Sequence, residues 1–199
     1  MYVIGVLGGV TSGKSLVSRQ LAELGAGLLD ADQAGHAALR LPEIEAAARQ
    51  RWGAAVFGPD VRIDRRRLAQ IVFATTPEGT AERKYLEQLT HPEIGRRLRC
   101  QSEELARAGR PAAVLDAALL LEAGWVDQCD RLLFVDVPRD VRLARAQARG
   151  WSEEEFAARE AAQQSLDLKR RGAEVILDNS GSPEQTRAQV ERFWQTLVD

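Results

Sequence analysis

Cysteine is scarce in this chain, since Cys100 and Cys129 are the two cysteines among 199 residues. Neither has a cysteine or histidine at a spacing typical of a metal site, and two isolated cysteines exclude a disulfide framework. Long apolar runs are missing as well. No stretch approaches the length of a membrane span, and the apolar N-terminus lacks the basic lead of a signal peptide. We therefore expect a cytoplasmic protein with reduced cysteines and no membrane partner.

A surplus of basic residues is also absent. Lys and Arg number 27 against 29 Asp and Glu, which gives a net charge of -2, whereas a general nucleic-acid binder needs a basic surface. We expect no nucleic-acid partner, and nothing in the sequence indicates an obligatory protein partner. Hydrophobic residues make up 45% of the chain, which is enough for the core of one α/β domain of this length.

What the sequence does contain is a phosphate-binding loop near its start. Residues 8–15 read GGVTSGKS and fit the pattern G-x-x-x-x-G-K-[ST]. The apolar run 2–7 before the loop is typical of a strand buried on both faces, and apolar residues recur at helical spacing in 16–24. Because strand, loop and helix follow in this order, the loop is predicted to bind nucleotide phosphates.

Each residue type in this loop has a separate task. Gly8, Gly9 and Gly13 allow a tight turn and bring backbone N–H groups close to phosphate oxygens. The N-terminus of the following helix adds positive potential. Lys14 is expected to reach the β- and γ-phosphates, and the Ser15 hydroxyl is expected to ligate Mg²⁺. ATP and Mg²⁺ are therefore the predicted cofactors.

Carboxylates follow two of the predicted strands. Asp30 and Asp32 come after the short second strand, and Asp116 ends the third. Ligands of an open parallel sheet gather at the carboxyl ends of its strands. One carboxylate of the pair is expected to act as general base toward an acceptor hydroxyl and the other to orient Mg²⁺, while Asp116 has the position of a Walker-B carboxylate. Ordinary capping is the open alternative for each. His36 is interpreted as an ordinary helix-surface residue.

Helical patterns fill the long interval between the second and third strands. Pro42 opens one helix, Asp64 caps another, a third follows Pro77, and His91-Pro92 is expected to open a fourth. This interval is longer than one crossover between parallel strands requires. We therefore predict an inserted helical subdomain that holds the second substrate.

A second helical pair is predicted after Pro138. Its first helix carries Arg142, Arg145 and Arg149 at spacings of three and four, hence on one face. Such a stripe is usually solvated. Next to a phosphate loop, however, a helix–turn–helix could fold over ATP as a lid that supplies arginines and excludes water.

Together these elements predict an α/β fold with a P-loop NTPase core, a five-stranded parallel sheet, a helical substrate-binding insertion and a small helical lid. Strands are expected at 2–7, 27–29, 112–116, 131–137 and 174–177. We assign 1–41, 110–137 and 172–199 to the nucleotide-binding core, 42–109 to the substrate-binding subdomain and 138–171 to the lid.

Several segments, in this order, resemble one family of the nucleoside-monophosphate-kinase-like fold, the dephospho-coenzyme A kinases. They are GGVTSGKS at 8–15, DAD at 30–32, IDR at 63–65 through Leu68, VF at 72–73, THPEI at 90–94, LLLE at 119–122 and DNSG at 178–181. The chain departs from the family's usual pattern at Ala117-Ala118, Gly95 and Glu174. The matching segments nevertheless extend over nearly the whole chain.

The resemblance implies ATP-dependent phosphorylation of the ribose 3′-hydroxyl of dephospho-coenzyme A (dephospho-CoA), giving coenzyme A (CoA) and ADP. It implies that Asp32 is the catalytic base, that Lys14 and Arg145 assist the transfer, and that Arg65 and His91 contact the acceptor. For His91, local packing at a helix start is an equal alternative. The residues implied to bind ATP are Gly9, Thr11, Ser12, Gly13, Lys14, Ser15, Leu16, Arg149 and, near the adenine, Asn179. Ser15 and Asp116 are the expected metal ligands.

Two rival functions stay open on the sequence alone. The first is a kinase of the same fold that phosphorylates another small hydroxyl compound, such as a nucleoside, shikimate or gluconate. The second is a nucleotide-dependent adaptor that binds ATP and a partner protein without turnover. The paired carboxylates and the arginine-bearing helix favour an enzyme, and the long insertion favours a large acceptor.

Overall fold

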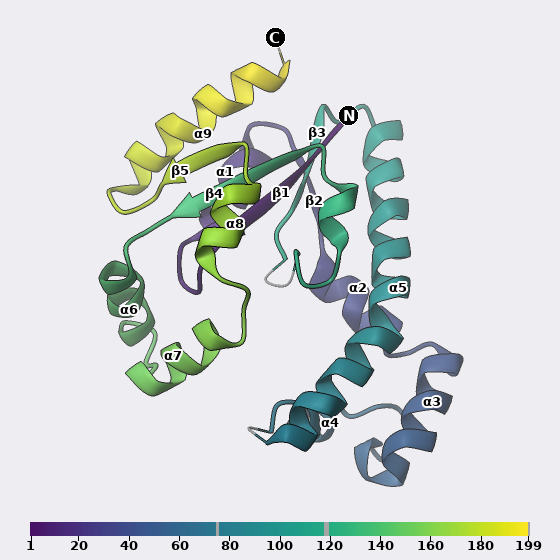
Figure 1. Cartoon of the computed structure of the whole chain (residues 1–199). Helices are drawn as coiled ribbons and strands as arrows, with labels where there is room; N and C mark the ends of the chain where they lie inside the picture. Colours follow the sequence, from purple (N-terminus) through teal and green to yellow (C-terminus); the bar gives the residue numbers. More distant parts are fainter. Residues whose placement is uncertain (75, 118–119, 199) are drawn as a thin grey trace. The chain divides into compact units, whose positions relative to one another are not determined.

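The computed structural model describes residues 1–74, 76–117 and 120–198 (Figure 1). The chain divides into two compact units, one formed by Met1–Asp30 with Arg99–Asp199 and the other by Ala31–Leu98. Each unit has its own hydrophobic core. In the part of the chain that the structure describes, no helix combines the length and the apolar character needed to cross a membrane.

The first unit is built on five parallel strands in the order β2-β3-β1-β4-β5, which confirms the predicted sheet. Strand β1 lies in the middle and is buried from its second residue onward, as its continuous apolar sequence predicts. Residues that follow β1, β3 and β4 therefore gather at one edge of the sheet. The strands are β1 (Tyr2–Gly8), β2 (Gly27–Leu29), β3 (Ala112–Leu115), β4 (Arg131–Asp136) and β5 (Val175–Asp178).

Helices cover both faces of this sheet. Helices α1 (Lys14–Glu23) and α9 (Pro183–Val198) pack against each other and against one face, where their apolar residues join those of the strands in one cluster. Helix α8 (Leu166–Gly172) contacts β1 and β4 and lies in front of the strands in Figure 1, whereas α1 lies behind them. The short η2 (Trp125–Gln128) precedes β4. The sheet thus forms the middle layer of the unit.

The two helices predicted after β4 are present as α6 (Arg139–Gln147) and α7 (Glu153–Ala161). Helix α7 begins with a capping box, in which Ser152 and Glu155 each accept a hydrogen bond from the other's backbone N–H. A small apolar cluster of Val10, Ala146 and Phe156 joins both helices to the loop after β1. Packing therefore fixes the pair against the phosphate loop.

The second unit is helical. It contains α2 (Ala31–Ala38), α3 (Pro42–Trp52), η1 (Gly53–Val56), α4 (Arg65–Val72) and the part of α5 (Pro77–Arg107) up to Leu98. The starts predicted at Pro42 and Asp64 are confirmed, since Pro42 opens α3 and the Asp64 carboxylate caps α4. An isolated antiparallel bridge between Phe57 and Ile63 makes a short hairpin, and apolar residues of α3, η1 and α4 form the core.

The predicted helix start at His91-Pro92 is wrong, because α5 runs unbroken from Pro77 to Arg107. Proline inside a helix removes one backbone hydrogen bond and crowds the preceding turn, at a cost of about 3 kcal/mol. The buried residues Thr90, Ile94 and Leu98 follow one another at spacings of four across the proline. Burial of this face offsets the loss, so tertiary packing overrides the local stop signal.

The environments of the two cysteines predict different reactivities. Burial, assisted by the neighbouring Asp130 carboxylate, raises the pKa of Cys129 to about 12, whereas Cys100 is exposed. At pH 8 iodoacetamide should alkylate Cys100 in the folded protein and leave Cys129 largely unmodified, because the thiolate is the reactive species. Peptide mass spectrometry checks this, with alkylation in 8 M urea as the control in which both react. Equal native rates would contradict the burial of Cys129.

Candidate active site

The loop between β1 and α1 has a backbone that only particular residues permit. Gly13 has φ 91° and Thr11 has φ 57°, both in the left-handed region. A Cβ added at Gly13 would lie 2.2 Å from Asn179 Nδ2, and one at Gly8 would lie 2.6 Å from Ser12 Oγ. The two glycines are therefore required both by dihedral angle and by space.

The N-terminus of α1 has the features of an anion-binding site. Its N-cap, Gly13, provides no side-chain acceptor for the first N–H groups of the helix, and such N–H groups together with the helix dipole attract phosphate. Leu16, in the first turn, is half-buried, and its N–H donates to Gly13 O at 2.9 Å. The anion-binding groups thus lie at the carboxyl end of the central strand, as the motif predicts.

Lys14 is held over the loop. Its Nζ donates to Gly9 O at 3.2 Å. Burial lowers the pKa of Lys14, the carboxylates of Asp116 and Glu122 oppose that shift, and the positive charges of Lys169 and Arg142 add to it. A partly desolvated cation among other cations gains strongly from a bound phosphate. This environment suits the expected contact with β- and γ-phosphates.

Ser15 and Asp116 come together as the sequence predicts. Ser15 Oγ donates to Asp116 Oδ2 at 2.8 Å, which joins the first turn of α1 to the residue after β3. Among the described residues, no group of three or more His, Cys, Asp or Glu side chains could hold a metal by itself. Mg²⁺ nevertheless takes only a few oxygen ligands from a protein when phosphates and water complete its coordination shell. One hydroxyl and one carboxylate beside a phosphate site fit that requirement.

Two side chains from other segments support the loop by donating hydrogen bonds to the backbone carbonyl of Ser12. Asn179 Nδ2 donates to Ser12 O at 2.7 Å and Arg145 Nη1 does so at 3.4 Å. Arg145 Nη2 also donates to Asn179 O at 2.7 Å, and Thr186 Oγ1 donates to Asn179 Oδ1 at 2.7 Å. Both ends of the Asn179 amide are thus engaged beneath the loop. Its implied position near the adenine stays a prediction.

The three arginines predicted to share one helix face have three different environments. Arg142 is 3% exposed, donates from Nη1 to Glu160 Oε1 at 2.6 Å, and its backbone oxygen accepts a bond from the Thr11 hydroxyl at 2.6 Å. Arg145 faces the loop as described above. Arg149 is exposed and lies beyond the end of α6, so the prediction of a common face is wrong for it. One member supports the fold and one supports the loop.

A buried ion pair near the loop was not predicted. Lys169 of α8 is 1% exposed, and its Nζ lies 3.4 Å from Glu122 Oε1 and 3.1 Å from Gln163 Oε1. The LLLE motif had marked Glu122, although Ala118 and Leu119 lie outside the described residues. The available signal for Lys169 was its spacing of three from Leu166, which places the two on one face of α8.

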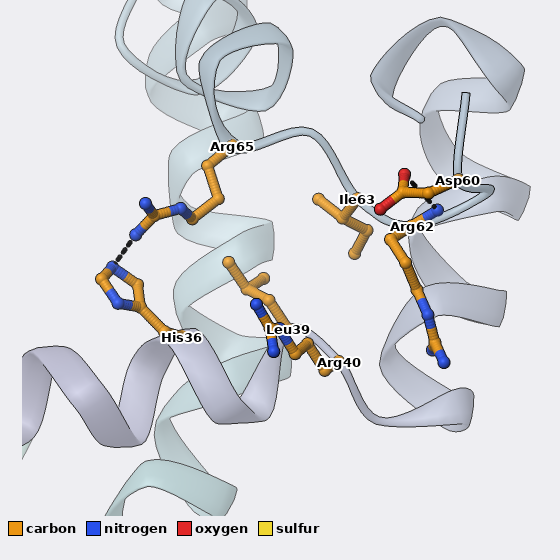
Figure 2. Close-up of a pocket in the computed structure, with 7 residues that line it drawn as sticks. All are labelled: His36, Leu39, Arg40, Asp60, Arg62, Ile63 and Arg65. Carbon is orange, nitrogen blue, oxygen red and sulfur yellow. Dashed lines mark hydrogen bonds between the residues drawn. The ribbon is translucent and has the colours of Figure 1, made fainter. Parts of the chain in front are cut away.

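Three of the expected site residues belong to the second unit. Asp32 is the second residue of α2 and is exposed. Arg65 opens α4 and donates from Nη1 to His36 Nε2 (Figure 2). His36 is exposed on α2, which confirms the prediction of a helix-surface residue. His91 lies within α5 and is half-buried, and its burial lowers the pKa of the imidazole. A neutral His91 at pH 7 follows from that direction.

The first unit therefore defines a class of protein. A parallel sheet, a glycine-rich loop at the end of its central strand, a lysine over the loop and a serine bonded to the adjacent strand's carboxylate make a P-loop kinase fold. Within that class, the family model for dephospho-CoA kinase matches residues 2–185. The chain belongs to the dephospho-CoA kinase family.

Individual relatives agree over nearly the full length. A dephospho-CoA kinase from Symbiobacterium thermophilum is 45% identical over 98% of this chain and 81% of its own length. The crystal structure of TT1252 from Thermus thermophilus is 35% identical, covers 98% of this chain and 97% of that one, and superposes with a TM-score of 0.78. A dephospho-CoA kinase from Campylobacter jejuni, 24% identical with a TM-score of 0.72 over 98% and 96%, shares the fold.

The support beneath the loop predicts the effect of Asn179→Ala. The substitution leaves Ser12 O without its 2.7 Å partner, so ATP affinity should fall about tenfold and the free energy of unfolding by about 1–3 kcal/mol. ATP titration calorimetry and urea denaturation measure the two effects. Ser180→Ala is the matched control, since the Ser180 side chain is exposed and bonds to Asp178. Wild-type ATP affinity in Asn179→Ala would show that the loop keeps its shape without this contact.

Proposed function

We propose that this protein transfers the γ-phosphoryl group of ATP to the ribose 3′-hydroxyl of dephospho-CoA. As a member of its family, it is a kinase that uses ATP and converts dephospho-CoA to CoA, the final step of CoA biosynthesis. The observation that carries the proposal is the family match over residues 2–185 combined with a complete phosphate loop, in which Lys14 Nζ donates to Gly9 O and Ser15 Oγ to Asp116 Oδ2. A cytoplasmic location stays a prediction.

Phosphoryl transfer needs positioning and charge neutralisation more than covalent help from the protein. In the proposal, N–H groups of the loop and of the first turn of α1 hold the β- and γ-phosphates, and Lys14 neutralises the charge that spreads over the equatorial oxygens. The guanidinium of Arg145, which lies against Ser12 O and Asn179 O, adds positive charge at the same loop. Arg149 is the proposed lid residue, because it is exposed just past α6.

Ser15 and Asp116 are the residues proposed to hold Mg²⁺. Their oxygens lie 2.8 Å apart, and a hydroxyl plus a carboxylate is a donor set that the ion accepts when phosphate oxygens complete its coordination. Mg²⁺ held by these two residues would supply positive charge that stabilises the charge developing during the transfer. Asp30 is not assigned to the metal, because the Ser15 hydroxyl bonds to Asp116 and Asp30 lies at the end of the first unit.

Asp32 is the proposed general base. Its carboxylate lies in the first turn of α2 and is exposed, so it is available to accept the proton of the acceptor hydroxyl. In a loose transition state this proton leaves late. The base therefore affects turnover and not the binding of ATP. Arg65 and His91, on the same unit, are the proposed acceptor contacts.

A first experiment tests the reaction and the base together. Mg²⁺-dependent ADP release should require dephospho-CoA and yield CoA by mass. In Asp32→Asn, kcat should fall about 10²- to 10⁴-fold, the range for loss of a general base, with ATP affinity unchanged. Asp30→Asn is the matched control and should keep most of the activity. A smaller effect of Asp32→Asn than of Asp30→Asn would move the base assignment to the other carboxylate.

The same assay separates the rival functions. ADP release that requires a nucleoside, shikimate or gluconate instead of dephospho-CoA would indicate a different acceptor on the same fold. ATP binding without ADP release with any acceptor would favour the adaptor. Either result would overturn the proposed substrate and leave the phosphate loop intact as the nucleotide site.

A second experiment tests the metal ligands. Ser15→Ala and Asp116→Asn should each raise the Mg²⁺ concentration for half-maximal activity by on the order of tenfold or more, because each removes one oxygen ligand. Magnesium titration at saturating ATP measures this. Ser18→Ala, whose hydroxyl bonds to Lys14 O, is the control within the same helix. An unchanged Mg²⁺ requirement in Asp116→Asn would exclude that residue as a ligand.

A further inference from the structure

Thr11 has a backbone conformation that its side chain disfavours. Its φ of 57° lies in the left-handed region, which glycine adopts freely and β-branched residues rarely adopt. Gly13, whose φ lies in the same region, is a glycine. A strained residue persists where the surrounding structure holds it, and such residues are concentrated at active sites. The presence of a threonine at this position therefore requires an explanation in the contacts that it makes.

The hydroxyl of Thr11 is directed into the protein. Thr11 is 8% exposed, and its Oγ1 donates to Arg142 O of α6 at 2.6 Å and to Val10 O at 2.7 Å. A hydroxyl has one hydrogen, so these two acceptors share it. The bond to Arg142 joins the loop to a helix that lies 131 positions further along the chain. The side chain of Thr11 therefore connects two segments, and its backbone N–H is the donor left for a phosphate.

Arg142 is bound to other parts of the site as well. Its Nε donates to Val137 O at 3.1 Å, and its Nη1 donates to Glu160 Oε1 of α7 at 2.6 Å. A Cβ added at Gly9 would lie 2.9 Å from Arg142 Nη1, so the guanidinium lies directly against the backbone of the phosphate loop. Arg142 thus contacts the loop through both its backbone and its side chain, and it also binds α7.

A second contact between α6 and the loop lies one helical turn further on. Ala146 packs with Val10 and Phe156 in the small apolar cluster, and all three residues are buried. Arg142 and Ala146 are four residues apart, so they lie on the same face of the helix. Because the two contacts are separated by one turn, α6 cannot slide along its axis or rotate about it without breaking one of them. The register of α6 against the loop is therefore fixed.

Arg145 lies between these two contacts in the sequence. Its Nη1 donates to Ser12 O at 3.4 Å and its Nη2 donates to Asn179 O at 2.7 Å. A guanidinium has five N–H groups, so these bonds leave donors for phosphate oxygens. An arginine that is already oriented loses little freedom when it binds an anion. The position of this guanidinium depends on the register of α6, because the helix carries it to the loop.

We propose that Thr11 is a positioning residue for phosphoryl transfer. Its hydroxyl joins α6 to the phosphate loop through Arg142 O and thereby fixes the guanidinium of Arg145 at the loop. The inference rests on the proposed function, in which Arg145 adds positive charge where the phosphates bind. It gives the Thr11 side chain a task that is separate from contact with ATP, and it explains why the strained threonine is present.

A double-mutant cycle tests this inference. Thr11→Val keeps the β-branched shape and removes the hydroxyl, so kcat should fall about 10- to 10²-fold, as expected when a catalytic group is misplaced by up to about 1 Å. Thr11→Ser keeps the hydroxyl and should retain most of the activity. In an Arg145→Gln background, Thr11→Val should cause little further loss, because both changes act on the same interaction. Thr196→Val is the matched control, since the Thr196 hydroxyl donates to Phe193 O within α9.

Hydrogen exchange detects the link between the loop and α6 independently of catalysis. Backbone amides of α6 should exchange about tenfold faster in Thr11→Val than in the wild type, the change expected for loss of one buried hydrogen bond. Thr11→Ser and Thr196→Val should exchange at the wild-type rate. Thr11→Gly is a second variant without the hydroxyl. Glycine adopts the φ of this position freely, so this variant should unfold at or above the wild-type temperature and still lose kcat as Thr11→Val does.

The outcomes separate this inference from the proposed function. Wild-type exchange of α6 in Thr11→Val would overturn the positioning role, and so would an equal loss of kcat on Thr11→Val with and without Arg145. Wild-type kcat in Arg145→Gln would overturn it as well, because the effect is assigned to that guanidinium. In all three cases CoA is still formed and the proposed function stands. Failure of the wild type to phosphorylate dephospho-CoA would overturn both.

Discussion

The phosphate loop can turn its N–H groups toward an anion only if its carbonyls are satisfied on the opposite side. A buried carbonyl without a donor costs about as much as a lost hydrogen bond. In this protein the donors for Ser12 O come from Asn179 and Arg145, and Thr186 fixes the orientation of the Asn179 amide. The segment after β5, helix α6 and helix α9 all contribute to the shape of a loop at the start of the chain.

The nucleotide side of the site was largely predictable from sequence. A continuous apolar run, a glycine-rich motif and a helical pattern each specify local structure, and the carboxyl ends of parallel strands have to meet at one edge. The Ser15–Asp116 contact follows from these rules, although the two residues are 101 positions apart. The loop, the parallel strands and the proximity of Ser15 to Asp116 could therefore be predicted without knowledge of side-chain packing.

The rest depended on packing that no local pattern encodes. Pro92 carries a strong stop signal, but the buried face of α5 outweighs it. Arg142 and Arg145 look alike in the sequence, yet one is buried against Glu160 and the other lies along the loop. Lys169 was hidden among the charged residues that follow it, Arg170 and Arg171. For such residues, the structural role depends on the group that they contact in the folded protein.

Gly13 and Asn179 show what this arrangement means for evolution. The asparagine fills the space that a side chain at position 13 would need, since an added Cβ would come within 2.2 Å of its amide nitrogen. A descendant that lost the asparagine would gain room at position 13 while losing the support of Ser12 O. The two positions are far apart in the gene, yet their side chains compete for one space, so the effect of a mutation at one should depend on the residue at the other.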